Sequence, residues 1–248
     1  MNISIHSGKG VLILLTAIFA FSTQHAFAQV NFTTDEAAFL AQNPNLATQD
    51  FESGNVAPDS VTQCSPVLNE NTNDACFSPG DILPGLEFTQ VPLGAHTLFI
   101  GGPDVEDNTF VVLYTDFNTD SMDITFPGNN VNVAGLILGC ISEGGLCINT
   151  FVIRVFGEGD EFIGSTATDV TGRFDTFVGI QSSELITRIN VASPTNGFEG
   201  LGRISFGLTP PRDIPALSEW GMIAAAAGLM LAGVFFAVRR RRRTSVVR

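Results

Sequence analysis

Three oxygen-bearing side chains at alternate positions, Asp116-x-Asn118-x-Asp120, have the types and spacing that best suit a chemical task. Carboxylate and amide oxygens spaced in this way let a tight loop wrap a hard cation such as Ca²⁺. The twelve-residue calcium loop does not fit, because its sixth and twelfth positions lack the required Gly and Glu. The alternative, which we favour, is an Asx-rich hairpin turn that joins the strand-like runs 109–114 and 121–126.

Signals for catalysis are weak. After the first 28 residues the only histidine is His96, so a Ser-His-Asp or Cys-His centre would depend on an ordinary loop residue. The acidic pairs Glu158/Asp160 and Asp104/Glu106 are of the kind that hydrolyses glycosides, but chance pairs are expected among 25 carboxylates. We therefore predict a protein that is not an enzyme and has no cofactor, with Ca²⁺ as the one candidate ion.

The charge of residues 29–219 excludes one class of partner. This stretch holds five arginines and no lysine against all 25 acidic residues, a net charge of −20. Such a surface repels phosphate backbones, so we expect no nucleic-acid partner. It attracts cations and favours solubility in an exposed or salty setting.

Four cysteines indicate disulfides, because an even count is typical of exported chains. They are Cys64, Cys76, Cys140 and Cys147, and three connectivities are open. We favour the local pairs Cys64–Cys76 and Cys140–Cys147, since each pair brackets a turn-rich loop. A zinc site would need tighter spacing than these positions offer.

Short strand-like runs fill most of the chain after a brief helix. Thr33-x-x-Glu36 has the pattern of a capping box and predicts a helix over 35–41. Turn residues at 157–160 predict a hairpin connection. Runs separated by turns every 8–12 residues are typical of an antiparallel β-sandwich of jelly-roll type, so we predict an all-β domain over 29–208. The runs are 86–89, 98–100, 109–114, 121–126, 131–138, 151–156, 162–164, 176–180, 185–191 and 203–206.

The two ends of the chain predict export and a membrane anchor. Residues 1–28 have a basic start, an apolar core and an Ala-Phe-Ala cleavage site, as a signal peptide does. Residues 220–238 are uncharged and would form a helix about 28 Å long, enough to span a membrane. The arginines at 239–243 would hold the tail 244–248 in the cytoplasm and place the domain on the far side. Residues 209–213 would form a Pro-rich stalk.

The segment 214–243 resembles the IPTL-CTERM sorting signal of Gram-negative bacteria. Its motif departs from the family name only at one position, where alanine replaces threonine. The resemblance implies recognition by an exosortase-type membrane enzyme, which would cut near the motif and pass the protein from the inner membrane to the envelope or outside. The motif residues are Ile214, Pro215, Ala216, Leu217, Ser218, Glu219, Trp220 and Gly221.

The domain itself loosely resembles secreted domains that carry related PEP-CTERM tails. The short segments that carry this resemblance include Asp50-Phe51-Glu52 and the closing Ile204-Ser205-Phe206-Gly207. An Asp often precedes the final strand of such domains, whereas this chain has Gly200-Leu201-Gly202-Arg203 in that stretch. This departure is evidence against the predicted calcium site. The resemblance implies a surface or matrix protein.

These observations give one leading hypothesis and two others. The first is a non-enzymatic surface or matrix protein associated with extracellular polysaccharide. The second is a calcium- or glycan-dependent binding module, an adhesin, and the third is a secreted hydrolase. Sugars commonly stack on Trp or Tyr, but Tyr114 is the only tyrosine and the only tryptophan belongs to the membrane end. Phenylalanine could substitute, but most of the phenylalanines are needed for the core.

Overall fold

The structure, a computed structural model, describes most of the chain between Val30 and Leu208. The described ranges are 30–92, 97–105, 108–116, 121–128, 130–141, 147–194 and 198–208, with Leu229, Met230 and Gly233. Met1–Leu208 and Thr209–Arg248 cluster as separate units. The signal peptide, the stalk, the sorting motif and the arginine cluster lie outside the described ranges, as does nearly all of the predicted membrane helix. Within those ranges, each helix falls short of the length and apolarity needed to cross a bilayer.

The larger sheet of the described domain has eight antiparallel strands. They are β1 (Val30–Thr33), β2 (Ala47–Gln49), β3 (Val61–Gln63), β6 (Leu98–Gly101), β7 (Val112–Thr115), β9 (Val133–Ile141), β12 (Thr176–Ser182) and β14 (Phe198–Gly207). Seven run in the order β1-β12-β9-β14-β7-β6-β3. β14 pairs with β9 along one side, while β7 and β2 share its other side. The central position of β14 makes it the strand around which this sheet is organised.

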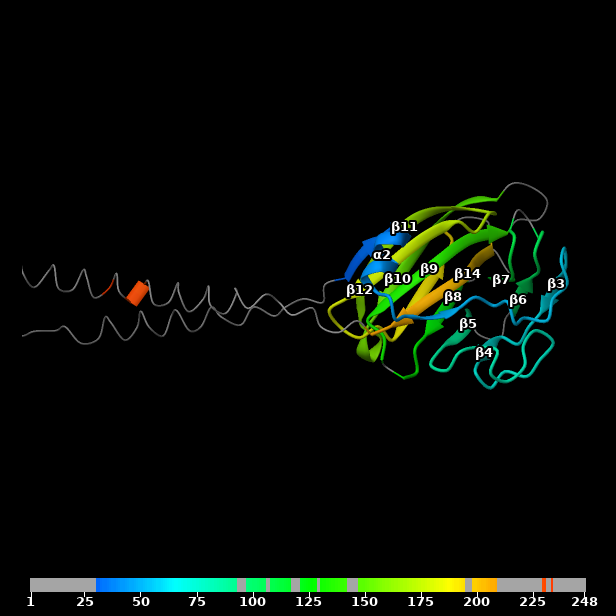
Figure 1. Cartoon of the computed structure of the whole chain (residues 1–248), viewed down its shortest axis with the longest axis horizontal. Coiled ribbons are helices and arrows are strands. Elements are labelled where there is room, and N and C mark those ends of the chain that lie inside the picture. The colour runs from blue at the N-terminus through cyan, green and yellow to red at the C-terminus, as the bar shows by residue number, and fades with distance from the viewer. Residues whose placement is uncertain are drawn as a thin grey trace, which may run out of the picture. The chain divides into compact units, whose positions relative to one another are not determined.

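The smaller sheet has six antiparallel strands among the described residues, and it packs face to face with the larger one (Figure 1). Its order is β11-β10-β13-β8-β5-β4. The strands are β4 (Val67–Asn69), β5 (Glu87–Val91), β8 (Ser121–Thr125), β10 (Ile148–Phe156), β11 (Phe162–Thr171) and β13 (Arg188–Ala192). The predicted antiparallel sandwich is confirmed.

Alternating side chains fill the space between the sheets. Ile124 of β8 and Ile153 of β10 have no exposed surface, and they belong to the same buried cluster as Leu136, Val178 and Leu201 of the larger sheet. Strand side chains point to opposite faces in turn, so the predicted alternation of these runs is confirmed. The same geometry sends every second residue of β10 outward on the smaller sheet.

Several strands extend further than the sequence predicted. β11 continues to Thr171 and β14 begins at Phe198, while β1, β2, β3 and β4 were not predicted at all. The four unpredicted strands have only three or four residues each, too few for an alternating pattern, and they become strands through their pairing partners. The turn at 157–160 does join β10 to β11, as predicted, through a short 3₁₀ turn η1 (Glu158–Asp160).

The helix α2 (Glu36–Gln42) is confirmed, but its cap differs from the prediction. Asp35 is the N-cap, and its side chain accepts a hydrogen bond from the Ala38 N–H at 2.9 Å. Thr33 is the last residue of β1 because its backbone pairs with β12, so the Thr33–Glu36 capping box does not form. Glu36 is thereby left to pair with another side chain.

Phenylalanine rings lie directly on strand glycines over the outer face of the larger sheet. Phe39 of α2 packs against Gly179 and Gly135, and its ring meets Phe177 edge-on at 5.3 Å. Phe174 covers Gly139 and Gly200. These rings form a second hydrophobic cluster that also contains Ile137 and Tyr114. Burial, reinforced by the charge of Asp116, raises the pKa of Tyr114, so this phenol stays neutral.

Both predicted cysteine pairs are confirmed. Cys64–Cys76 has an S–S distance of 2.01 Å, and Cys140–Cys147 joins the end of β9 to the residue before β10. Inside the first loop, the Asp74 carboxylate accepts hydrogen bonds from the N–H groups of Ser65, Cys76 and Phe77 at 2.6–2.9 Å. Partial burial acts to raise the pKa of Asp74, but these bonds outweigh it and lower the pKa from 3.8.

The pH dependence of stability tests the role of Asp74. A group whose pKa is lower in the folded state stabilises the fold above its unfolded pKa and loses that effect as the pH falls through its folded value. Asp74→Asn should therefore unfold at lower urea than the wild type at neutral pH, and the gap should close below pH 3.8. A gap that is constant or widens in acid would contradict this account.

A methyl group at Gly139 tests the contact between rings and glycines. Gly139→Ala would place a Cβ inside the Phe174 ring and should lower the free energy of unfolding by about 1–3 kcal/mol. Gly128→Ala is the matched control, because Gly128 is exposed and its nearest neighbour is a surface Asn130 side chain. Urea denaturation of both variants gives the comparison, and equal midpoints would show that the Phe174 ring moves aside freely.

Candidate functional site

A cleft of about 450 Å³ lies on the outer face of the larger sheet. Its position follows from the fold, because α2, the loop after β2, the loop before β7 and the β11–β12 turn all meet over β9 and β14. We call it the acidic cleft. It is lined by Glu36, Asp50, Glu52, Phe110, Ile137, Phe174, Asp175, Gly202 and Arg203.

The floor of the acidic cleft is apolar and aromatic. Phe174 is buried, and Phe110 meets it edge-on with ring centroids 6.4 Å apart. A Cβ at Gly202 would lie 2.5 Å from the Phe110 ring, so the glycine lets this ring settle onto β14. Phe110 itself is half-buried and lines the cleft.

Four carboxylates and one guanidinium form the rim. Arg203 of β14 makes an ion pair with Glu36, the first residue of α2, and both side chains are partly exposed. Glu52 accepts a hydrogen bond from the Val111 N–H at 3.1 Å, which fixes the loop that carries Phe110. Asp50 and Asp175 are exposed at the rim. The rim therefore has four carboxylates and one guanidinium, and that guanidinium is already paired with Glu36.

The rim carboxylates come from three segments: α2, the loop after β2 and the β11–β12 turn. No three acidic, histidine or cysteine side chains among the described residues come close enough together to hold a metal ion. Ionised carboxylates accept hydrogen bonds from hydroxyl and ammonium groups, and a guanidinium donates them. The acidic cleft thus offers an aromatic surface with hydrogen-bonding groups around it, an arrangement suited to a polar organic ligand.

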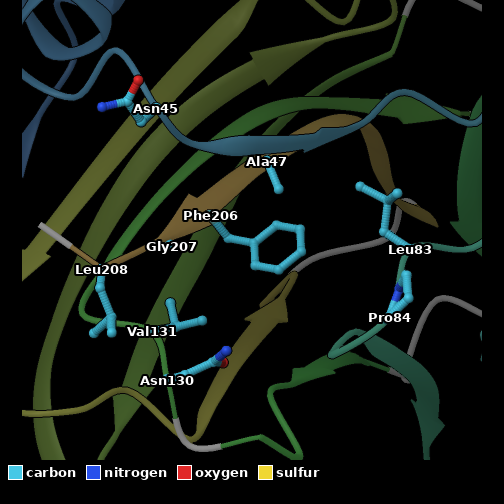
Figure 2. Close-up of a pocket in the computed structure, with 9 residues that line it drawn as sticks. All are labelled: Asn45, Ala47, Leu83, Pro84, Asn130, Val131, Phe206, Gly207 and Leu208. Atoms are coloured by element: carbon cyan, nitrogen blue, oxygen red, sulfur yellow. The ribbon is translucent and has the colours of Figure 1, made fainter.

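A second hollow of about 360 Å³ lies beside the end of β14 (Figure 2). The side chains of Phe206, Val131 and Leu83 face it, with Asn45 and Asn130 at its margins. The described residues that line it carry no charged side chain. It offers fewer directed polar contacts than the acidic cleft, and we do not assign it a ligand.

The predicted calcium ligands are placed only in part. Asp116 follows β7, but Asn118 and Asp120 lie outside the described residues, so the calcium prediction stays a prediction. The favoured hairpin turn is wrong, because β7 belongs to the larger sheet and β8 to the smaller one.

Glu199 is a buried acidic residue that sequence analysis missed. It is fully buried in β14, and Thr115, the residue before Asp116, donates a hydrogen bond to its Oε2 at 2.7 Å. The Ser193 N–H donates to its Oε1 at 2.5 Å. Burial of a carboxylate in a strand gives no signal in the sequence, because Glu199 sits at a regular strand position among small and apolar residues.

The predicted acidic pairs show no catalytic arrangement among the described residues. Asp160 binds Arg188 at 2.6 Å, and the same guanidinium binds Asp123 and lies 3.7 Å above the Phe156 ring. These groups satisfy one another on the outer face of the smaller sheet. Asp104 lies in a turn, while its predicted partner Glu106 and the lone His96 lie outside the described residues.

Comparison with known proteins finds structural likeness only. No family model matches the chain, and no curated protein matches it. Three similar solved structures are a histidine mutant of the lectin binding domain of Lectinolysin complexed with Lewis b, CsCBM6-3 from Clostridium stercorarium in complex with cellobiose, and the carbohydrate binding module CBM6cm-2 from Cellvibrio mixtus lichenase 5A in complex with cellotriose.

The likeness to these structures is distant. In the same order, they share 13%, 14% and 10% identity with TM-scores of 0.31, 0.29 and 0.28. The alignments cover 40%, 49% and 66% of this chain and 72%, 93% and 98% of theirs.

Proposed function

We propose that this domain is a non-catalytic glycan-binding module and that the acidic cleft is its binding site. The observation that carries the proposal is the half-buried Phe110 in the cleft lining, with carboxylates and a guanidinium around it. A sugar ring presents apolar C–H groups on its faces and hydroxyl groups at its edges. The cleft offers a partner for each, in a volume suited to a small ligand.

A binding role suits the rim better than hydrolysis does. A glycosidase needs one carboxyl group to donate a proton and another to act as base or nucleophile. Here Glu36 is tied to Arg203 and Glu52 is tied to the Val111 N–H, which fixes both as hydrogen-bond acceptors.

Oligosaccharide binding tests the proposed site directly. We expect the exported protein to bind at least one of four soluble oligomers: cellohexaose, chitohexaose, a glucosamine hexamer and an oligogalacturonate. Phe110→Ala should weaken that binding about tenfold, because a lost aromatic contact costs roughly 1 kcal/mol or more. Calorimetry with and without EDTA also shows whether a bound cation such as Ca²⁺ takes part.

Phe162→Ala is the matched control for Phe110→Ala. Phe162 is an exposed phenylalanine on β11 of the smaller sheet, away from the cleft. Both variants remove a phenyl ring that meets one other phenylalanine edge-on, so urea denaturation of both shows how much stability each change costs. Binding that Phe110→Ala leaves intact, or absence of binding to all four oligomers, would refute the cleft as a glycan site.

We further propose that the protein is exported and sorted to the cell envelope, where glycan binding would attach it to extracellular polysaccharide. Two disulfides support an oxidising compartment. The eight-residue motif at 214–221, followed by an uncharged run and five arginines, supports processing by an exosortase-type enzyme. A matrix component of this kind needs no catalytic activity.

Processing can be followed in cells by mass. We expect the exported protein to lose both the first 28 residues and the segment after the motif, so that mass spectrometry finds neither end in the envelope fraction. Pro215→Ala together with Trp220→Ala should leave the C-terminal segment attached and hold the protein in the inner membrane. If the wild-type chain were found uncut in purified inner membrane, the sorting proposal would be contradicted. The C-terminal segment would then act only as a membrane anchor.

A further inference from the structure

The charge of the acidic cleft distinguishes between classes of glycan, if the cleft binds glycans as proposed above. We infer that its ligand carries protonated amines, as a polymer of glucosamine units with free amino groups does. The inference goes beyond glycan binding, because most polysaccharides are neutral or acidic. It rests on the rim charges, their spacing and the aromatic floor.

The rim has an uncompensated negative charge. Arg203 is the only cation in the lining, and its ion pair with Glu36 cancels it. Asp50, Glu52 and Asp175 have no cationic partner among the described residues and are exposed. These three carboxylates would attract ammonium groups and repel uronate or sulfate groups on a polysaccharide.

The spacing of the carboxylates favours an extended organic cation over a metal ion. A hard metal ion requires several oxygens at one point, and the described residues provide no such group in the cleft. A polymer with one amine on each sugar carries its charges at intervals and can meet carboxylates placed around a rim. Such a polymer therefore suits the carboxylates of the cleft better than a bare metal ion does.

The aromatic floor adds a second attraction for the same ligand. An ammonium group close to the face of a phenylalanine ring is attracted by the negative charge of that face. Phe110 is half-buried in the cleft and meets Phe174 edge-on, with an angle of 81° between the two rings. An amino sugar could place either its C–H face or its ammonium group on this ring.

Matched oligomers test the inference. The exported protein is titrated at mildly acidic pH, where amines are protonated and carboxylates remain ionised, with a glucosamine hexamer, its N-acetylated counterpart chitohexaose, and an oligogalacturonate. We expect the glucosamine hexamer to bind about tenfold more tightly than chitohexaose, since screened charge pairs at three carboxylates each contribute a modest factor. The oligogalacturonate should bind the weakest.

Salt and charge-neutral variants supply the controls. Tighter binding of the glucosamine hexamer should disappear between about 0.01 M and 1 M NaCl, as the screening length falls from ~30 Å to ~3 Å. Asp50→Asn with Asp175→Asn should remove the preference while chitohexaose binding persists. Glu161→Gln with Glu184→Gln removes two exposed charges away from the cleft and should keep the preference.

The outcomes separate this inference from the proposed function. If chitohexaose or cellohexaose binds in a manner that depends on Phe110 and the glucosamine hexamer binds no more tightly, the glycan site stands and the inference is wrong. The inference would also be overturned if the Glu161/Glu184 substitutions removed the preference as readily as the Asp50/Asp175 substitutions do. The net charge of the protein, rather than the cleft, would then be the cause of the preference. If none of the oligomers binds, the proposed function itself fails.

Discussion

The packing of phenylalanine rings on strand glycines determines the shape of this domain outside its main core. Phe174 covers Gly139 and Gly200, and Phe39 covers Gly179, so no side chain separates these rings from the sheet. A close-packed interior cannot take up an extra methyl group without strain, which makes the glycines part of the packing. The rings bury the outer face of β9 and β14, and they anchor both α2 and the β11–β12 turn. The acidic cleft exists because these two segments, fixed in place by their rings, stand on either side of it.

Electrostatics then give the cleft its character. The domain carries a large negative charge, and only one of its few arginines reaches the cleft, where Glu36 neutralises it. Elsewhere the charges are arranged to satisfy one another, as around Arg188, or are held by backbone N–H groups, as at Asp74. At the cleft rim, the exposed carboxylates lie beside aromatic residues that also line the cleft. This combination makes the acidic cleft, rather than the rest of the acidic surface, our candidate binding site.

Local patterns in the sequence predicted the two-sheet architecture but could not predict the cleft. The alternation in 121–126 and 151–156 predicted which side chains enter the core, and the loop composition between the cysteines favoured the pairing that forms. The first half of β14 was missed because Gly200 and Gly202 look like turn residues, whereas they are strand residues that receive Phe174 and Phe110. Likewise, Asp35 rather than Thr33 caps α2 because pairing with β12 draws Thr33 into a strand. Such contacts join residues far apart in the chain, and no local pattern encodes them.

A crystal structure of the exported protein bound to a glucosamine hexamer would test the central claim most directly. The account predicts a sugar ring against Phe110 in the acidic cleft, with its amines directed to the carboxylates of Asp50, Glu52 or Asp175. The cleft walls should move little, because their rings are already seated on the sheet. A hexamer bound instead in the hollow beside Phe206, or across the Arg188 network of the smaller sheet, would contradict it.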